Sequence, residues 1–198
     1  ELLTEMKEPT SFRGLLVRAS ELLLTDQHPH SLDMRQMRIK GYERFAGAVY
    51  SELVNVSREH RSKPGRANAQ IVMNPYNVWK AITQDSACSI AEDINPIMNI
   101  KEGEAVTYGG TGGRNARAMV RTAREFHPSD MGVISESTTD SSDVAINTYT
   151  SANPRFNSVR GTSTPIDMSN VPTSSVISTS ALLAPGSTND DMRRVGFV

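Results

Sequence analysis

The chain has 198 residues, a formal net charge of -1, and 37% hydrophobic and 6% aromatic residues. This length allows one or two domains with a real core. The near-neutral charge excludes a chain that coats nucleic acid over its whole surface, so any contact with a polyanion must rest on local patches. The single cysteine, Cys88, excludes an internal disulfide and is typical of a reducing compartment. No apolar run approaches the ~20 residues that a membrane span needs.

The N-terminal part of the chain is predicted to be mainly helical. Residues 1–26 indicate one helix, which Thr10 or Ser11 could cap and whose leucines recur on one face. Residues 31–61 indicate a second helix, with apolar residues at spacings of three and four. Between them, His28 to His30 favour a polar turn over a metal site, because no third ligand is near in the sequence. The chain starts at Glu1 without methionine, and we interpret it as part of a longer polypeptide.

Shorter helices are predicted in the middle of the chain. Asn74 and Pro75 begin a helix that runs through Ile82, and Trp79 is expected to lie in the core. Residues 86–93 indicate another short helix, in which Cys88 is expected to be buried rather than reactive. The pattern from residue 97 to residue 108 is mixed.

A glycine loop followed by a row of arginines is the most informative feature of the sequence. The loop has four glycines around Thr111: Gly109, Gly110, Gly112 and Gly113. Four arginines follow, with no carboxylate among them: Arg114, Arg117, Arg121 and Arg124. Their spacings of three, four and three would place all four on one stripe of an α-helix. A mobile backbone followed by a row of guanidinium groups suits an extended polyanion such as nucleic acid.

The last third of the chain is more polar. Residues 135–142 lack apolar anchors, and residues 144–148 alternate like a strand. Residues 151–172 indicate a long irregular connection. Residues 176–183 predict a buried helix, and residues 190–194 predict a helix start whose two carboxylates suit the helix dipole.

Self-contained catalytic motifs are weak in this sequence. A phosphate-binding P-loop would need Gly-Lys-Ser/Thr, whereas Gly113 is followed by Arg114 and Asn115. The dinucleotide fingerprint lacks its third glycine, and no G-x-S-x-G nucleophile motif occurs. The pair Asp190 and Asp191 fits a helix cap better than a metal site. If the protein serves an enzyme, its catalytic metal ligands are expected in another chain.

An ordered series of short motifs runs without a gap through the centre of the chain. It consists of N-P-I at 95–97, G-T-G-G at 110–113, N-A-R-A at 115–118 and R-E-F-H-P at 124–128. In this order the motifs resemble the N-P-L-S-E-I, G-P-G-G, T-R-E-R-A-G and R-D-V-H-P-T-H-x-G runs of the β subunit of multisubunit DNA-directed RNA polymerases. The ordered combination is far more specific than any one motif.

Flanking segments extend the resemblance over most of residues 15–198. Residues 32–41 are similar to the family's L-x-N-R-R-I-R-x-x-G, residues 136–147 to E-T-P-E-G-x-x-x-G-L-I-N, and residues 182–194 to S-L-I-P-F-x-x-x-D-D-A-N-R. The weakest part lies between about 150 and 172. The short connection and the sequence drift resemble the divergent, often split β-like subunits of large bacteriophages.

The resemblance implies an α+β fold, a mainly helical lobe and fork region with short strands and long irregular connections. It divides the chain into a helical lobe segment (1–73), a fork and rifampicin-pocket-like region (74–150), an irregular connection (151–172) and the start of a nucleotide-channel segment (173–198). In this family the glycine loop and its arginines match fork loop 2, which lies by the downstream edge of the transcription bubble.

The resemblance also implies which residues bind. Nucleic acid is expected to meet Gly112, Gly113, Arg114, Arg117 and Arg121. The incoming nucleoside triphosphate is expected to meet Arg194 and Asp191. No catalytic residue is expected in this chain, because the aspartates that hold the two Mg²⁺ ions of the active centre belong to the β′-like partner.

A changed rifampicin pocket is a further implication of the resemblance. The family's aspartate, histidine and serine positions are matched by Glu92, Glu102 and Thr107, and the basic pair after the histidine is matched by Gly103 and Glu104. The resemblance therefore predicts insensitivity to rifampicin.

The implied partners are β′-like subunits, other β-like fragments, the DNA template, the RNA transcript and the triphosphate, with no membrane. The expected location is the host cytoplasm during infection, with packaging in the virion left open. Two other hypotheses remain. A non-enzymatic virion or scaffold protein would bind nucleic acid or a partner through a basic helix, and a P-loop-like enzyme would bind ATP tightly by itself.

Overall fold

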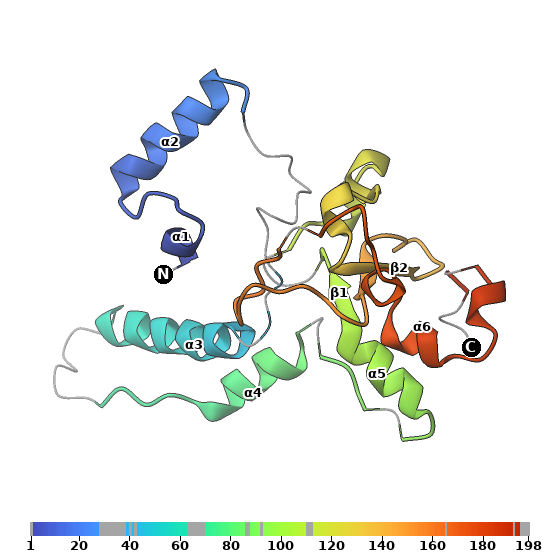
Figure 1. Ribbon diagram of the computed structural model, residues 1–198. Coiled ribbons are helices and arrows are strands. Elements are labelled where there is room, and N and C mark those ends of the chain that lie inside the picture. Colours follow the sequence, from blue (N-terminus) through green and yellow to red (C-terminus); the bar gives the residue numbers. More distant parts are fainter. Residues whose placement is uncertain are drawn as a thin grey trace.

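The computed structural model describes residues 2–27, 39, 41, 43–62, 70–85, 88–91, 93–109, 113–164, 166–191 and 193–194. The α-helices of this part are α1 (Leu2–Glu5), α2 (Phe12–Leu24), α3 (Glu43–Ser62), α4 (Pro75–Thr83), α5 (Pro96–Glu104) and α6 (Thr179–Leu183). The strands are β1 (Ala105–Thr107), β2 (Ile134–Thr138) and β3 (Asn147–Thr150). Figure 1 shows the small sheet beside α5 and α6, with α3 and α4 in a separate helical pair. The fold is α+β, as predicted.

The sheet is antiparallel, with the strand order β1-β3-β2. Thr107 of β1 lies opposite Asn147 of β3, and the pairing of β2 with β3 is irregular between Ile134 and Thr138. Val133 and Ile134 form a small core cluster, against which Ile39 and Val106 pack. Because α5 runs directly into β1, the sheet holds the start of the glycine loop.

Strand β2 corrects the prediction for the polar stretch at 135–142. Its two serines, Ser135 and Ser137, are buried, and the hydroxyls of Ser135 and Thr138 bond to the backbone of β3. The Ser135 hydroxyl donates to the Tyr149 carbonyl at 2.8 Å, and the Thr138 hydroxyl donates to the Asn147 carbonyl at 3.0 Å. Small side chains that satisfy their own hydrogen bonds can occupy a sheet interior without apolar anchors.

A carboxylate joins the helix before the sheet to the helix after it. Glu104, the last residue of α5, accepts hydrogen bonds from the Thr179 amide (2.9 Å) and from the Ser180 amide (3.3 Å) and hydroxyl (3.1 Å). These amides belong to the first turn of α6, where a negative charge is favourable. The predicted helix within 176–183 therefore forms over its second half, Thr179–Leu183.

The helical pair α3 and α4 is joined by buried polar contacts. Glu52 of α3 is 8% exposed and accepts from the Asn77 side chain at 3.0 Å and from the Asn74 amide at 3.4 Å. Asn74 also caps α4, since its side chain accepts from the Tyr76 amide at 3.0 Å. The predicted start of this helix is confirmed. The predicted second helix begins at Glu43 among the described residues, and 31–38 lie outside them.

The N-terminal helix is divided, which corrects the prediction of one helix over 1–26. Lys7 has a φ of 59°, outside helical geometry, and the chain turns there between α1 and α2. Ser11, one of the two predicted caps, accepts from the Gly14 amide at 3.1 Å.

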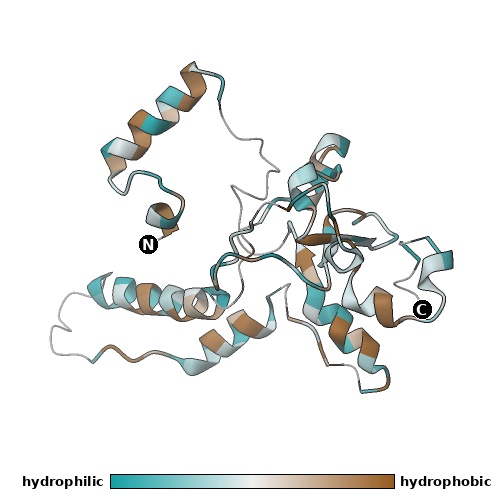
Figure 2. Cartoon of the chain, in the orientation of Figure 1, coloured by the Kyte–Doolittle hydropathy of each residue, from teal (hydrophilic) through white to brown (hydrophobic). Residues whose placement is uncertain are grey.

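Several residues predicted to be buried are exposed instead. Trp79 is 64% exposed, and Cys88 is exposed in a stretch, residues 88–91, that is not helical. The predictions of a core tryptophan and a buried cysteine were therefore wrong. Figure 2 shows apolar stretches along α2 and α4. No helix among the described residues is long and apolar enough to cross a membrane.

Candidate nucleic-acid interface

The two ends of the glycine loop lie next to each other at the end of β1. The Thr107 hydroxyl accepts from the Gly109 amide at 3.0 Å, and the Arg114 amide donates to the Tyr108 carbonyl at 2.7 Å. These two bonds hold the loop ends beside β1, so the arginines that follow begin from a fixed position. Gly112 lies outside the described residues, together with 110 and 111.

Gly113 occupies a position that only glycine fits. A Cβ atom there would lie 2.5 Å from the Gly109 carbonyl oxygen and would also meet the Tyr108 carbonyl oxygen. Both atoms belong to the backbone, so they cannot rotate away as a flexible side chain would. The glycine therefore lets the two ends of the loop approach each other closely.

The arginine segment, residues 114–124, is not the α-helix that its spacing predicted. It forms two short 3₁₀ turns, Ala116–Ala118 and Arg121–Arg124, joined by Met119 and Val120 in extended geometry. Met119 is 6% exposed, so its side chain is buried between the two turns. The four arginines consequently do not share one helical stripe.

Arg124 has a structural role in this segment. Its Nε donates to the Met119 carbonyl (3.0 Å), its Nη2 to the Ala116 carbonyl (3.3 Å) and its Nη1 to the Ser142 carbonyl (2.8 Å). The Ala116 and Met119 carbonyls are among those that a continuous helix would have paired internally. The guanidinium thus replaces helical hydrogen bonds and fastens the segment to residue 142.

The other three arginines are exposed. Among the described residues, the guanidinium groups of Arg117 and Arg121 have no acidic partner within ion-pair distance. Arg114 lies near Tyr108. The pKa of Tyr108 is raised, mainly by burial and further by the charge of Asp130, and the charge of Arg114 offsets part of this rise. Arg117 and Arg121 can therefore approach an external anion without first breaking an ion pair of the described fold.

Among the described residues at this end of the chain, the predicted triphosphate contacts lie in a turn and outside any helix. Asp191 accepts from the Arg193 side chain at 3.1 Å and 2.8 Å and from the Arg193 amide at 3.0 Å. These bonds, together with the charges of Arg193 and Arg194, hold the pKa of Asp191 at about 2. Arg194 is exposed, and its amide donates to the Asp191 carbonyl at 2.7 Å. The sequence reasoning missed Arg193, although its spacing of two from Asp191 allows this turn.

The rifampicin-pocket equivalents are only partly described. Glu92 lies outside the described residues. Glu102 is half-buried on α5, and its charge adds to the burial that raises the pKa of Tyr149. Thr107 supports the glycine loop, as described above. These observations do not test the predicted insensitivity, which stays a prediction.

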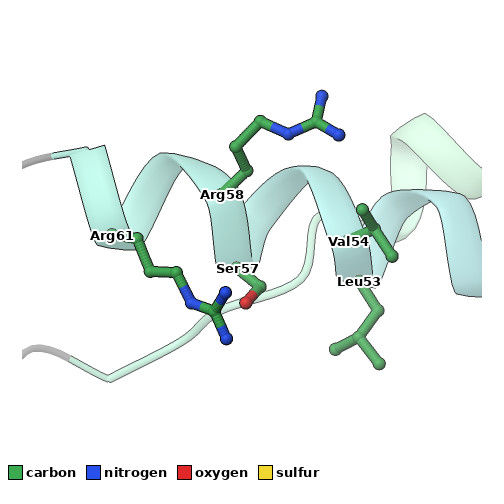
Figure 3. Close-up of a pocket in the computed structure, with 5 residues that line it drawn as sticks. All are labelled: Leu53, Val54, Ser57, Arg58 and Arg61. Carbon is green, nitrogen blue, oxygen red and sulfur yellow. The ribbon is translucent and has the colours of Figure 1, made fainter.

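A groove on α3 was not selected from the sequence. It has a volume of about 390 Å³ and is lined by Leu53, Val54, Ser57, Arg58 and Arg61. Figure 3 shows Arg58 pointing to one side of the helix, and Leu53, Ser57 and Arg61 pointing to the opposite side. All these lining residues come from α3, so no second element of the described chain closes the groove into a binding site. The described part of the chain also has no group of three His, Cys, Asp or Glu that could hold a metal ion.

These features define an α+β protein with an exposed arginine segment next to a glycine loop, which suits contact with a polyanion. The model of the bacteriophage RNA polymerase family matches residues 1–117, more than half of the chain. The chain therefore belongs to the bacteriophage RNA polymerase family, which acts in transcription. The match includes the glycine loop, Arg114 and Arg117. A comparison with individual curated proteins gives no match.

Proposed function

We propose that the chain is part of the β-like subunit of a multisubunit DNA-dependent RNA polymerase, where it positions DNA, RNA and the incoming triphosphate. The observation that supports this most is the ordered motif series from residue 95 to residue 128, which begins inside the region matched by the phage polymerase family. The arginines of this series that face solvent follow a loop whose ends the sheet holds in place.

The arginine segment acts as the strand-separating fork in this proposal. Arg114, Arg117 and Arg121 contact phosphates of the DNA by the downstream edge of the bubble. Contacts of this kind do not depend on base sequence and weaken as salt rises. Gly113 and Gly112 let the loop approach the strands without side chains in the way.

The turn at 190–194 faces the incoming nucleotide in this proposal. The planar guanidinium of Arg194 neutralises phosphate charge as the nucleotide is transferred. Asp191 is bonded to Arg193, so it contributes by holding the turn that presents Arg194. The Mg²⁺ ions would be bound by aspartates of the β′-like partner, and the chain alone is expected to be inactive.

Co-expression with β′-like chains tests the subunit assignment. We expect these chains to co-purify and the complex to synthesise RNA from a DNA template. Arg194→Ala should slow nucleotide addition and leave the subunit composition unchanged, whereas Arg13→Ala, which removes an exposed arginine of α2, should have no effect. Absence of β′-like chains from an active complex would contradict the subunit assignment, and normal elongation by Arg194→Ala would remove the role of Arg194.

The alternative of a virion or scaffold protein depends on a basic helix that binds nucleic acid or a partner. The arginine segment forms two 3₁₀ turns instead of that helix, so this alternative loses its main support there. We propose that the polymerase works in the host cytoplasm during infection. Detection of the chain in purified virions would show that it is also packaged.

A further inference from the structure

One face of α3 is turned away from α4. Helix α4 meets the opposite face, where Glu52 is buried and accepts hydrogen bonds from the Asn77 side chain and the Asn74 amide. An α-helix turns by about 100° per residue, so Tyr50 and Arg61 lie about 160–180° around the helix from Glu52. Tyr50 is 67% exposed, which agrees with a face that α4 does not cover.

The groove of about 390 Å³ on α3 lies along this face. Its apolar surface comes from Leu53 and Val54, and its charge comes from Arg58 and Arg61. Leu53 is 45% exposed, and Figure 3 shows Leu53 and Arg61 pointing to the same side of the helix. An apolar stripe on a helix normally packs against a second element, yet every described residue that lines the groove belongs to α3.

The same face carries two small residues near the start of α3. Ala46 and Gly47 are exposed, and a Cβ atom added at Gly47 would meet no other atom within 4 Å. Contacts within the described fold therefore do not require this glycine, although glycine is less favourable than alanine inside a helix. A residue without a side chain instead permits the close approach of a second backbone.

The charge of this face lies at one end. Arg58 and Arg61 are exposed, and no carboxylate among the described residues lies within ion-pair distance of either guanidinium. Two cations at the C-terminal end of a helix suit its dipole, but the dipole does not explain the apolar stripe that leads to them. A ligand that matches the whole face has an apolar side and a negative charge at one end.

We propose that this face of α3 binds an amphipathic α-helix of another protein chain. The apolar side chains of the partner helix lie against Tyr50, Leu53 and Val54, and its acidic first turn lies against Arg58 and Arg61. Acidic residues are favourable in the first turn of a helix, so the two helices run antiparallel. Residues 46–61 extend over about 24 Å, which matches about four turns of the partner. This surface goes beyond the proposed polymerase function and does not depend on it.

Nucleic acid fits this face less well than a protein helix does. Phosphates would pair with Arg58 and Arg61. The aliphatic side chains of Leu53 and Val54, however, offer no hydrogen bond to a phosphate and no ring on which a base can stack. The apolar part of the face is explained by a helix whose apolar residues recur every three or four positions.

A pair of synthetic peptides tests the proposal. The first is a labelled four-turn helix with leucines at spacings of three and four and with three glutamates in its first turn. The second has lysines in place of the three glutamates. Fluorescence anisotropy measures their binding to the full chain. We expect the glutamate peptide to bind at least tenfold more tightly, because its charges meet arginines that have no acidic partner among the described residues.

Three variants locate the binding on α3. Arg58→Glu combined with Arg61→Glu should reverse the preference, so that the lysine peptide binds more tightly. A variant that had merely unfolded would lose both peptides and would not reverse their order. Leu53→Ser should weaken both peptides at least threefold. Arg13→Glu combined with Arg155→Glu, the same charge change at exposed positions outside α3, should leave the preference as it was.

Three results would overturn the proposal. The first is equal binding of the two peptides, or no binding of the glutamate peptide. The second is a preference that survives the double change at Arg58 and Arg61. The third is displacement of the glutamate peptide by an equal concentration of a single-stranded DNA oligonucleotide, together with no effect of Leu53→Ser, which would assign the face to nucleic acid.

Discussion

Arg124 and Arg121 lie three residues apart and have opposite surroundings. The Arg124 guanidinium donates to three backbone carbonyls, whereas Arg121 is exposed. Both residues are arginines in one regularly spaced row, so the sequence predicted the same role for both and could not distinguish a structural arginine from an exposed one. Their difference depends on the tertiary structure, because the Arg124 guanidinium reaches the Ser142 carbonyl, 18 residues further along the chain.

Replacement of Arg124 is expected to destabilise the fold. Arg124→Met keeps much of the side-chain length but leaves the Met119 and Ser142 carbonyls without the guanidinium, whereas the Ala116 carbonyl still accepts from the Met119 amide. The loss should cost about 2 kcal/mol of unfolding free energy. Arg121→Met is the matched control and should change stability little, because that guanidinium has no acidic partner among the described residues. Denaturant unfolding followed by circular dichroism measures both. Equal stability of the two variants would contradict the structural role of Arg124.

The pKa of Asp191 is expected to respond to its neighbour. Arg193→Ala should raise the Asp191 pKa from about 2 towards its ordinary value of 3.8, because the hydrogen bonds from the Arg193 side chain lower it most. A carboxyl with a lowered pKa in the folded state stabilises that state above its ordinary pKa, and this contribution is lost as pH falls from 3.8 towards 2. NMR titration of the Asp191 side chain checks the shift. Arg194→Ala should shift it less, since Arg194 acts through charge alone; a larger shift in that variant would contradict the assignment.

Helix ends were predictable where the cap is local. Ser11 and Asn74 each bond to an amide two or three residues ahead, so the sequence alone contains both partners. Helix α5 was missed because the apolar pattern from residue 97 to residue 108 is mixed, although its start is local: the Asn95 side chain accepts from the Ile97 amide. Strand β2 was missed because the hydroxyls of Ser135 and Thr138 bond to a strand that comes later in the chain.

The link between α5 and α6 should depend on the charge of Glu104. Glu104→Gln keeps the shape but weakens the bonds to the Thr179 and Ser180 amides, with a loss of about 1 kcal/mol. Hydrogen exchange at these amides should therefore become faster. Glu102→Gln, on the same helix, is the control and should leave exchange at α6 unchanged. Unchanged protection in Glu104→Gln would show that α6 does not depend on this carboxylate.

Charge is distributed unevenly along the chain, so a chain with a net charge of -1 can still bind DNA through a locally positive segment. No carboxylate lies between Gly109 and Arg124, so the arginine segment is locally positive although the chain is not. The sequence predicted this patch because charge order is local information. It could not predict the groove that this segment forms with residues 144–145, because they lie about 20 residues further along the chain.

Removal of the three exposed arginines should change how DNA binding by the assembled polymerase depends on salt. Arg114, Arg117 and Arg121 replaced together by alanine should weaken DNA retention. The slope of log binding constant against log salt should become flatter by about two to three, because each lost phosphate contact contributes about 0.9. Filter binding or fluorescence anisotropy at several salt concentrations measures the slope.

A second triple variant separates local contact from net charge. Alanine at Arg13, Arg18 and Arg155 removes the same charge from exposed positions outside the arginine segment. If the arginine segment contacts phosphate, this control keeps the original slope, because distant exposed charges are screened within about 10 Å at 0.1 M salt. Equal flattening by both variants would mean that only overall charge matters, and an unchanged slope in the first would leave the arginine segment as ordinary surface.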